Sequence, residues 1–164
     1  MHGNYQLRLK VPETNGPEVL LQSLGIYDIG RSRESAEVSV WGDVMGDGSV
    51  THSPAELAEF QTRRVLGYSG KVSGHHAMLT VKGDKVAIYD DGSSNGLFYS
   101  GRGGYVPIQE RTLDQGKHRL RLGDLPLEII VEPYSSETKA TESSPEKARG
   151  LRSLARGLIR AIKG

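Results

Sequence analysis

The chain has 164 residues, of which 36% are hydrophobic, 21 are glycine and 7 are proline. The hydrophobic content suffices for one core. The many glycines and prolines indicate short strands joined by turns, and so predict an all-β fold. The lack of cysteine excludes a disulfide framework and a thiolate metal site. Because the sequence has neither an apolar run of membrane-spanning length nor a secretory signal at its start, we expect a cytoplasmic protein.

Charge is unevenly distributed along the chain. The formal net charge is +1, but the residues after 146 contain six lysines and arginines and no acid. The tail therefore carries +6 and residues 1–146 carry −5. An acidic body is followed by a basic tail.

Strand patterns occupy most of the body. Polar and apolar residues alternate at 5–11, 18–30 and 36–41, with glycine and proline between these segments. The pattern returns at 75–90 and in several short segments before residue 134. Short strands at close spacing are typical of a sandwich or a barrel.

One segment within the strands carries helix signals. Ser53 is a capping residue, Pro54 follows at the first helical position, and Glu56 stands three residues after the cap. Apolar residues then recur at roughly helical spacing. We expect a short helix over 53–66, inside an insertion that covers 42–70.

Two segments follow the strands. Residues 135–146 are rich in Ser, Thr and Glu and predict a disordered linker. Residues 147–164 place leucines and isoleucines on one helical face and arginines on the other, which predicts a basic amphipathic helix. An anionic membrane surface, a grooved partner protein or the acidic body would each satisfy both faces, so membrane association is one alternative. Nucleic acid would leave the apolar face unexplained, and we do not expect it as a partner.

Polar motifs stand at three strand ends, as Gly30-Arg31, Ser73-x-x-His76 and Ser94-Asn95-Gly96. A later Leu-x-x-Gly segment begins at residue 113. Together, their order and residue types resemble the forkhead-associated (FHA) domain. The resemblance covers residues 5–132, and it implies that 1–134 form an FHA-like β-sandwich of two sheets with a helical insertion.

The resemblance implies a phosphothreonine-peptide site. A phosphate on a peptide needs a permanent cation and orientable donors, which Arg31 and the hydroxyls of Ser73 and Ser94 would supply. Asn95 carries both a donor and an acceptor for the backbone of an extended peptide. Gly74 replaces the arginine of many family members. Beside these, Lys71 would partly replace the missing charge, and Gly30, His76 and Gly96 would have structural roles.

We therefore expect a non-enzymatic signalling or scaffolding module that binds a phosphothreonine-containing protein downstream of a Ser/Thr kinase. The chain offers no catalytic motif with a confirming context. The alternative is a scaffold that binds unmodified protein and keeps only a residual phosphate site. Dependence of binding on the phosphate separates the two hypotheses.

The start of the insertion resembles a dockerin or EF-hand calcium loop. Asp43, Asp47 and Ser49 fall at ligand positions, but Met45 and Pro54 occupy two positions that need oxygen donors. Glu56, two residues after Pro54, is the remaining acidic candidate. Calcium binding and a plain glycine-rich turn are both open interpretations, and no other cofactor is expected.

The adjacent pair His75-His76 is a weak metal motif, because neighbouring side chains on a strand point to opposite faces. His76 is expected to orient loops and His75 to be exposed.

Overall fold

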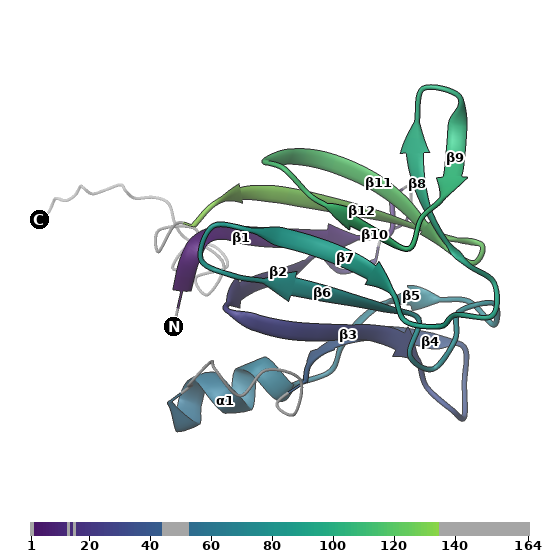
Figure 1. Cartoon of the computed structure of the whole chain (residues 1–164). Coiled ribbons are helices and arrows are strands. Elements are labelled where there is room, and N and C mark those ends of the chain that lie inside the picture. The colour runs from purple at the N-terminus through teal and green to yellow at the C-terminus, as the bar shows by residue number, and fades with distance from the viewer. Residues whose placement is uncertain (1, 13, 15, 44–52, 135–164) are drawn as a thin grey trace, which may run out of the picture. The chain divides into compact units, whose positions relative to one another are not determined.

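Two six-stranded antiparallel sheets form a sandwich in the computed structural model (Figure 1). The structure describes residues 2–12, 14, 16–43 and 53–134. The chain divides into the units Met1–Tyr134 and Ser135–Gly164, and all described residues belong to the first. The predicted all-β sandwich is confirmed.

The first sheet contains both ends of the described unit. Its strand order is β2-β1-β12-β11-β8-β9. In this sheet β1 pairs with β12, so that Tyr5 lies opposite Pro133. The strands are β1 (His2–Lys10), β2 (Val19–Ser23), β8 (Leu97–Gly101), β9 (Gly104–Pro107), β11 (Gly116–Leu122) and β12 (Leu125–Pro133).

The second sheet has the order β10-β7-β6-β3-β4-β5. Since β3 is antiparallel to β6 and β6 to β7, the end of β3, the start of β6 and the end of β7 meet at one edge of the sandwich. The strands are β3 (Gly25–Arg31), β4 (Glu37–Gly42), β5 (Arg64–Tyr68), β6 (Ala77–Val81), β7 (Val86–Asp90) and β10 (Glu110–Thr112).

Alternating side chains from both sheets form the core. Leu7 and Leu9 on β1 are fully buried, as are Ile29 on β3 and Ile88 on β7. The period of two follows from the pleat, which directs successive side chains to opposite faces. This core gives the loops at the sandwich edge a rigid base.

The helix α1 (Pro54–Gln61) begins where the sequence predicts. Ser53 Oγ accepts a hydrogen bond from the Glu56 amide, at 3.2 Å, and Glu56 Oε1 accepts one from the Ser53 amide, at 2.9 Å. This capping box satisfies two amides at the helix start. Phe60 is buried against Tyr27, with the ring centroids 4.9 Å apart, and fixes the helix to the sheet.

The predicted helix end at residue 66 is wrong. The helix stops at a cap on Thr62, which is extended, and Arg64–Tyr68 forms β5 beside β4. Pairing with β4 supplies backbone hydrogen bonds and buries Leu66, which is 1% exposed. The proposed insertion 42–70 therefore contributes a strand to the sandwich as well as a helix.

Several predictions fall outside the described residues. These are the linker 135–146, the amphipathic helix 147–164, and the calcium candidates Asp47 and Ser49. Within the ranges that the structure describes, no helix has the length and apolar character needed to cross a membrane.

Candidate functional site

The predicted phosphopeptide residues come together at one end of the sandwich. Arg31 ends β3, residues 69–76 join β5 to β6, and residues 91–96 join β7 to β8. One open hollow of about 290 Å³ lies between these segments. All six residues predicted for the site line it, namely Arg31, Lys71, Ser73, Gly74, Ser94 and Asn95.

Backbone carbonyls hold the half-buried Arg31 side chain in place. Its Nε donates to the carbonyl oxygen of Val72 at 2.8 Å, and its Nη1 donates to those of Ser32 and Ser35, both at 3.2 Å. No described residue accepts a hydrogen bond from Nη2. The guanidinium is therefore fixed in orientation while one nitrogen stays available to an anion in the hollow.

The two loops of the site are tied to each other by polar contacts. Ser73 Oγ accepts a hydrogen bond from the backbone amide of Ser94 at 3.0 Å. Asn95 Nδ2 donates to the carbonyl oxygen of Lys71 at 2.9 Å. The same side chains that could contact a ligand thus hold the loops in register before any ligand arrives.

His76 is fully buried and forms a hydrogen bond to each of these two loops. Its Nδ1 accepts a hydrogen bond from the Ser73 amide at 3.0 Å, so Nε2 carries the proton and donates to the Gly96 carbonyl oxygen at 2.7 Å. Burial lowers the pKa of the imidazole below its ordinary value. The ring is neutral at pH 7 and links the two loops, as the sequence suggested.

Close backbone approach explains two glycines of the motif. A Cβ on Gly30 would lie 1.8 Å from the carbonyl oxygen of Gly74, so the β5–β6 loop can pack against β3 only over a glycine. Gly96 has a φ of +88°, which favours glycine. A Cβ on Gly74 would meet nothing closer than the Arg31 carbonyl oxygen at 3.8 Å.

A second hollow of about 560 Å³ adjoins the first and contains two cations that sequence reasoning missed. Arg33 and Arg63 line it together with Arg31. The guanidinium of Arg63 lies 3.6 Å above the centroid of the Trp41 ring. The sequence signal was obscured because Arg63 was assigned to the helix instead of to the connection before β5.

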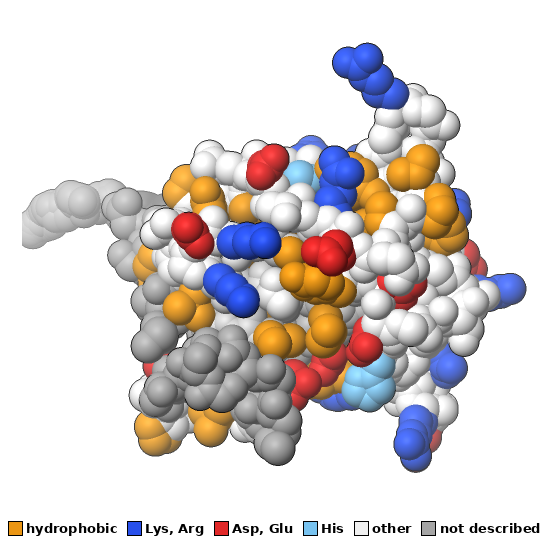
Figure 2. Space-filling view, in the orientation of Figure 1, with side chains coloured by type: hydrophobic (Ala, Val, Ile, Leu, Met, Phe, Trp, Pro, Cys, Tyr) orange, Lys and Arg blue, Asp and Glu red, His pale blue; other side chains and the backbone are white. Residues whose placement is uncertain are grey.

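Acidic side chains gather beside a histidine near the middle of β3 and the end of β4, on the face shown in Figure 2. Of the calcium candidates, Asp43 lies here, next to Asp28. Glu56 caps α1 and is used by the helix. Calcium binding by the insertion stays a prediction.

One family model matches part of the chain. Residues 59–125 match the family model of the FHA domain, a range that holds the whole site except Gly30 and Arg31. No curated protein matches the chain.

Several FHA domains are among the solved structures to which the chain is similar. The FHA domain of the CT664 protein from Chlamydia trachomatis is 22% identical, with 76% of this chain and 96% of that one covered and a TM-score of 0.49. Rv1747 FHA-1 from Mycobacterium tuberculosis is 15% identical, with 79% and 98% covered and a TM-score of 0.49. An FHA domain from Arabidopsis thaliana is 15% identical, with 92% and 96% covered and a TM-score of 0.48.

Proposed function

We propose that the end of the sandwich around Arg31 binds phosphothreonine on a partner protein, because residues 59–125 match the family model of the FHA domain. The FHA family consists of non-enzymatic protein-interaction modules, and the match supports an interaction role for this chain. The observation that carries phosphate binding is the Arg31 guanidinium, which backbone carbonyls fix beside a hollow while Nη2 stays available.

The hydroxyls of the site complement this cation. Ser73 Oγ already accepts a hydrogen bond from the Ser94 amide, so its own proton is free to be donated to a phosphate oxygen. The Ser94 hydroxyl lines the same hollow and offers a second neutral donor. A phosphate dianion with three acceptor oxygens can use all of these groups at once.

Asn95 would hold the peptide backbone beside the phosphate. Its Nδ2 is engaged with the Lys71 carbonyl, whereas no described residue donates to its Oδ1. That oxygen can accept an amide proton from an extended peptide. The site would therefore recognise the partner mainly through its phosphate and its peptide backbone. A Ser/Thr kinase would act upstream, by phosphorylating the partner.

The phosphate dependence is tested by calorimetry on the full chain. A phosphothreonine peptide selected from a library is compared with the same peptide unphosphorylated, and we expect binding of the phosphorylated form only. Loss of a charge-assisted contact costs about 1.5–3 kcal/mol, so Arg31→Ala should weaken binding at least tenfold.

The controls separate charge loss from unfolding. Arg31→Lys keeps the charge but loses the planar donor set, and it should also bind weakly. Arg102→Ala removes an exposed arginine of the β8–β9 turn and should bind like the wild type. Equal affinity for phosphorylated and bare peptides would overturn the proposal in favour of a phospho-independent scaffold.

A further inference from the structure

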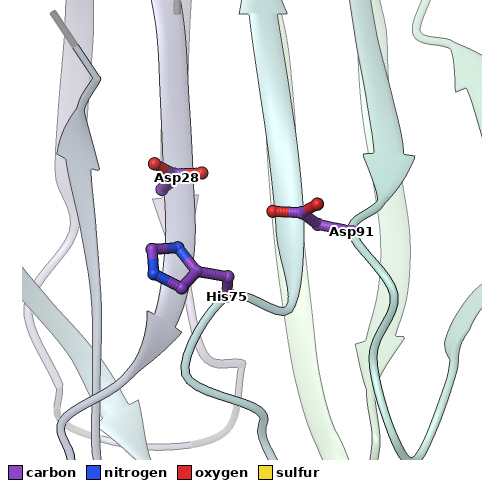
Figure 3. A group of neighbouring side chains, drawn as sticks. All are labelled: Asp28, His75 and Asp91. Atoms are coloured by element: carbon purple, nitrogen blue, oxygen red, sulfur yellow. The ribbon is translucent and has the colours of Figure 1, made fainter. Parts of the chain in front are cut away.

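A cluster of metal-ligating side chains adjoins the larger hollow, which His75 lines. Asp28 belongs to β3, His75 to the β5–β6 loop and Asp91 to the β7–β8 loop (Figure 3). One ligand atom from each residue lies within 4.8 Å of the other two. Three separate elements thus direct two carboxylates and an imidazole toward one point.

Asp28 is the unusual member, because its side chain is buried and, among the described residues, the exposed His75 is its only basic neighbour. The residue is 5% exposed, and no described amide, hydroxyl, lysine or arginine donates to its carboxylate. Its charged neighbours are Asp43, His75 and Asp91, and its side-chain contact with Asp43 joins two carboxyl groups. A buried carboxylate facing two others is costly unless a proton or a cation neutralises it.

The pKa of the Asp28 carboxyl is raised, as its burial beside other carboxylates predicts. Burial, and then the negative charge of Asp43, raises the pKa of Asp28 to about 6.

We propose that Asp28, His75 and Asp91 bind a divalent transition-metal ion, with Asp43 as a fourth oxygen ligand. The donor set is one nitrogen and several carboxylate oxygens with no sulfur, which suits Zn²⁺ or Mn²⁺. Calcium takes oxygen ligands only and would leave the imidazole unused. The site differs from the EF-hand-like loop suggested by the sequence, with which it shares Asp43 alone.

The present spacing needs only a small adjustment to accept such an ion. Ligand atoms about 2.0–2.2 Å from one zinc ion lie roughly 3.3–3.6 Å from each other in a tetrahedron. His75 is exposed and its ring meets that of Trp41 edge on, so it can turn toward the carboxylates. Its exposure also provides the entry path for the ion.

Trp41 provides the readout for a direct test. It is the only tryptophan of the chain, and its ring centroid lies 5.9 Å from that of His75. Zn²⁺ is titrated into full-length, tag-free, chelator-treated protein while tryptophan fluorescence is recorded, and equilibrium dialysis measures the stoichiometry. We expect one equivalent to bind saturably with a change in Trp41 emission.

Matched variants identify the ligands. Asp28→Asn and His75→Gln should each lower the Zn²⁺ affinity at least tenfold, whereas Asp84→Asn, at an exposed turn, should match the wild type. Zn²⁺ should raise the melting temperature of the wild type and leave that of Asp28→Asn unchanged. This second measurement does not depend on the fluorescence signal.

Three outcomes would overturn the proposal. They are the absence of saturable Zn²⁺ and Mn²⁺ binding, an unchanged affinity in both ligand variants, and Ca²⁺ binding that is tighter than Zn²⁺ binding and indifferent to His75→Gln. None of these measurements involves a peptide, so they are independent of the phosphothreonine proposal.

Discussion

Two polar clusters share the same short loop, and they are opposite in charge. Ser73 and Gly74 line hollows that contain arginines and hydroxyls. The next residue, His75, lines the larger hollow and also lies beside Asp28 and Asp91. Residues 74 and 75 form a turn, so neighbouring positions of one loop contribute to both the anion site and the proposed cation site.

The clusters also differ in how they are stabilised. In the hollow, backbone groups satisfy the polar side chains, as with Arg31 Nε and the Val72 carbonyl. In the acidic cluster, Asp28 meets mainly like charges. The first arrangement is preorganised for its ligand, while the second carries an electrostatic penalty that a ligand would remove.

Gly30→Ala should disrupt both clusters and have the largest effect. The new Cβ would lie 1.8 Å from the Gly74 carbonyl oxygen, so the loop that the clusters share must move. We expect a loss of about 3 kcal/mol or more in the free energy of unfolding, measured by urea denaturation. Gly74→Ala, whose Cβ has 3.8 Å of space, is the control and should change stability little. A Gly30→Ala protein as stable as the wild type would contradict this packing.

Asp28→Asn should stabilise the metal-free protein at pH 7.5. The pKa of Asp28 is raised from 3.8 to about 6 in the folded state, so folding is penalised once the group ionises. A shift of this size corresponds to at most about 3 kcal/mol.

The stabilisation by Asp28→Asn should depend on pH. Between pH 4 and 6 the folded wild type binds more protons than the unfolded chain, so the Asp28 contribution to stability falls as pH rises. The gain from Asp28→Asn should therefore be full above pH 6 and vanish below pH 4. The difference between the free energies of unfolding of the two proteins, measured by urea titration, is the quantity to follow. His76 contributes with the opposite sign, but both proteins contain it, so its contribution cancels in this difference. A constant difference across this range would refute the assignment.

Ser73→Ala should separate the two clusters by function. It removes a phosphate donor and the acceptor of the Ser94 amide, which should weaken phosphopeptide binding by about 1–1.5 kcal/mol, or roughly fivefold to tenfold. Zn²⁺ affinity should be unchanged. Asp28→Asn is the reciprocal variant, with peptide affinity kept and Zn²⁺ affinity lost. Parallel losses in either variant would show that the clusters act as one site.

Gly74→Arg should give the smallest change, a gain in phosphopeptide affinity. The position has room for a side chain and lines both hollows, so an arginine there adds a cation near the phosphate. An exposed charge pair contributes about 0.2–1 kcal/mol, which corresponds to an increase of up to roughly fivefold in calorimetry. Gly103→Arg, in open space on the β8–β9 turn, controls for net charge. Weaker binding would mean that the glycine is needed for peptide access.

Local signals predicted the helix start, and the family resemblance predicted the residues that line the smaller hollow. The Ser53 and Glu56 pair specifies a capping box whatever the tertiary structure, and the motifs around Arg31, Ser73 and Ser94 could be placed by their order and residue types. The identity of β5 could not be predicted in this way. Short apolar spacing in 64–68 fits a helix or a strand, and pairing with β4 decides between them.

The acidic cluster had no sequence motif, because Asp28, His75 and Asp91 come from three elements far apart in the chain. One clue was present in Asp28 itself, an acid between the buried residues Tyr27 and Ile29 of a strand. Which other residues face it depends on sheet order, which the sequence pattern does not contain.

The pairing of β1 with β12 has a consequence for how the domain folds. Residues at opposite ends of the described unit, such as Tyr5 and Pro133, become neighbours, so a central part of the first sheet closes only after about 130 residues have been synthesised. Such distant pairing slows folding and leaves strand edges exposed in the meantime. A fragment restricted to the family-matched residues 59–125 would lack both strands, and we expect it to aggregate instead of folding.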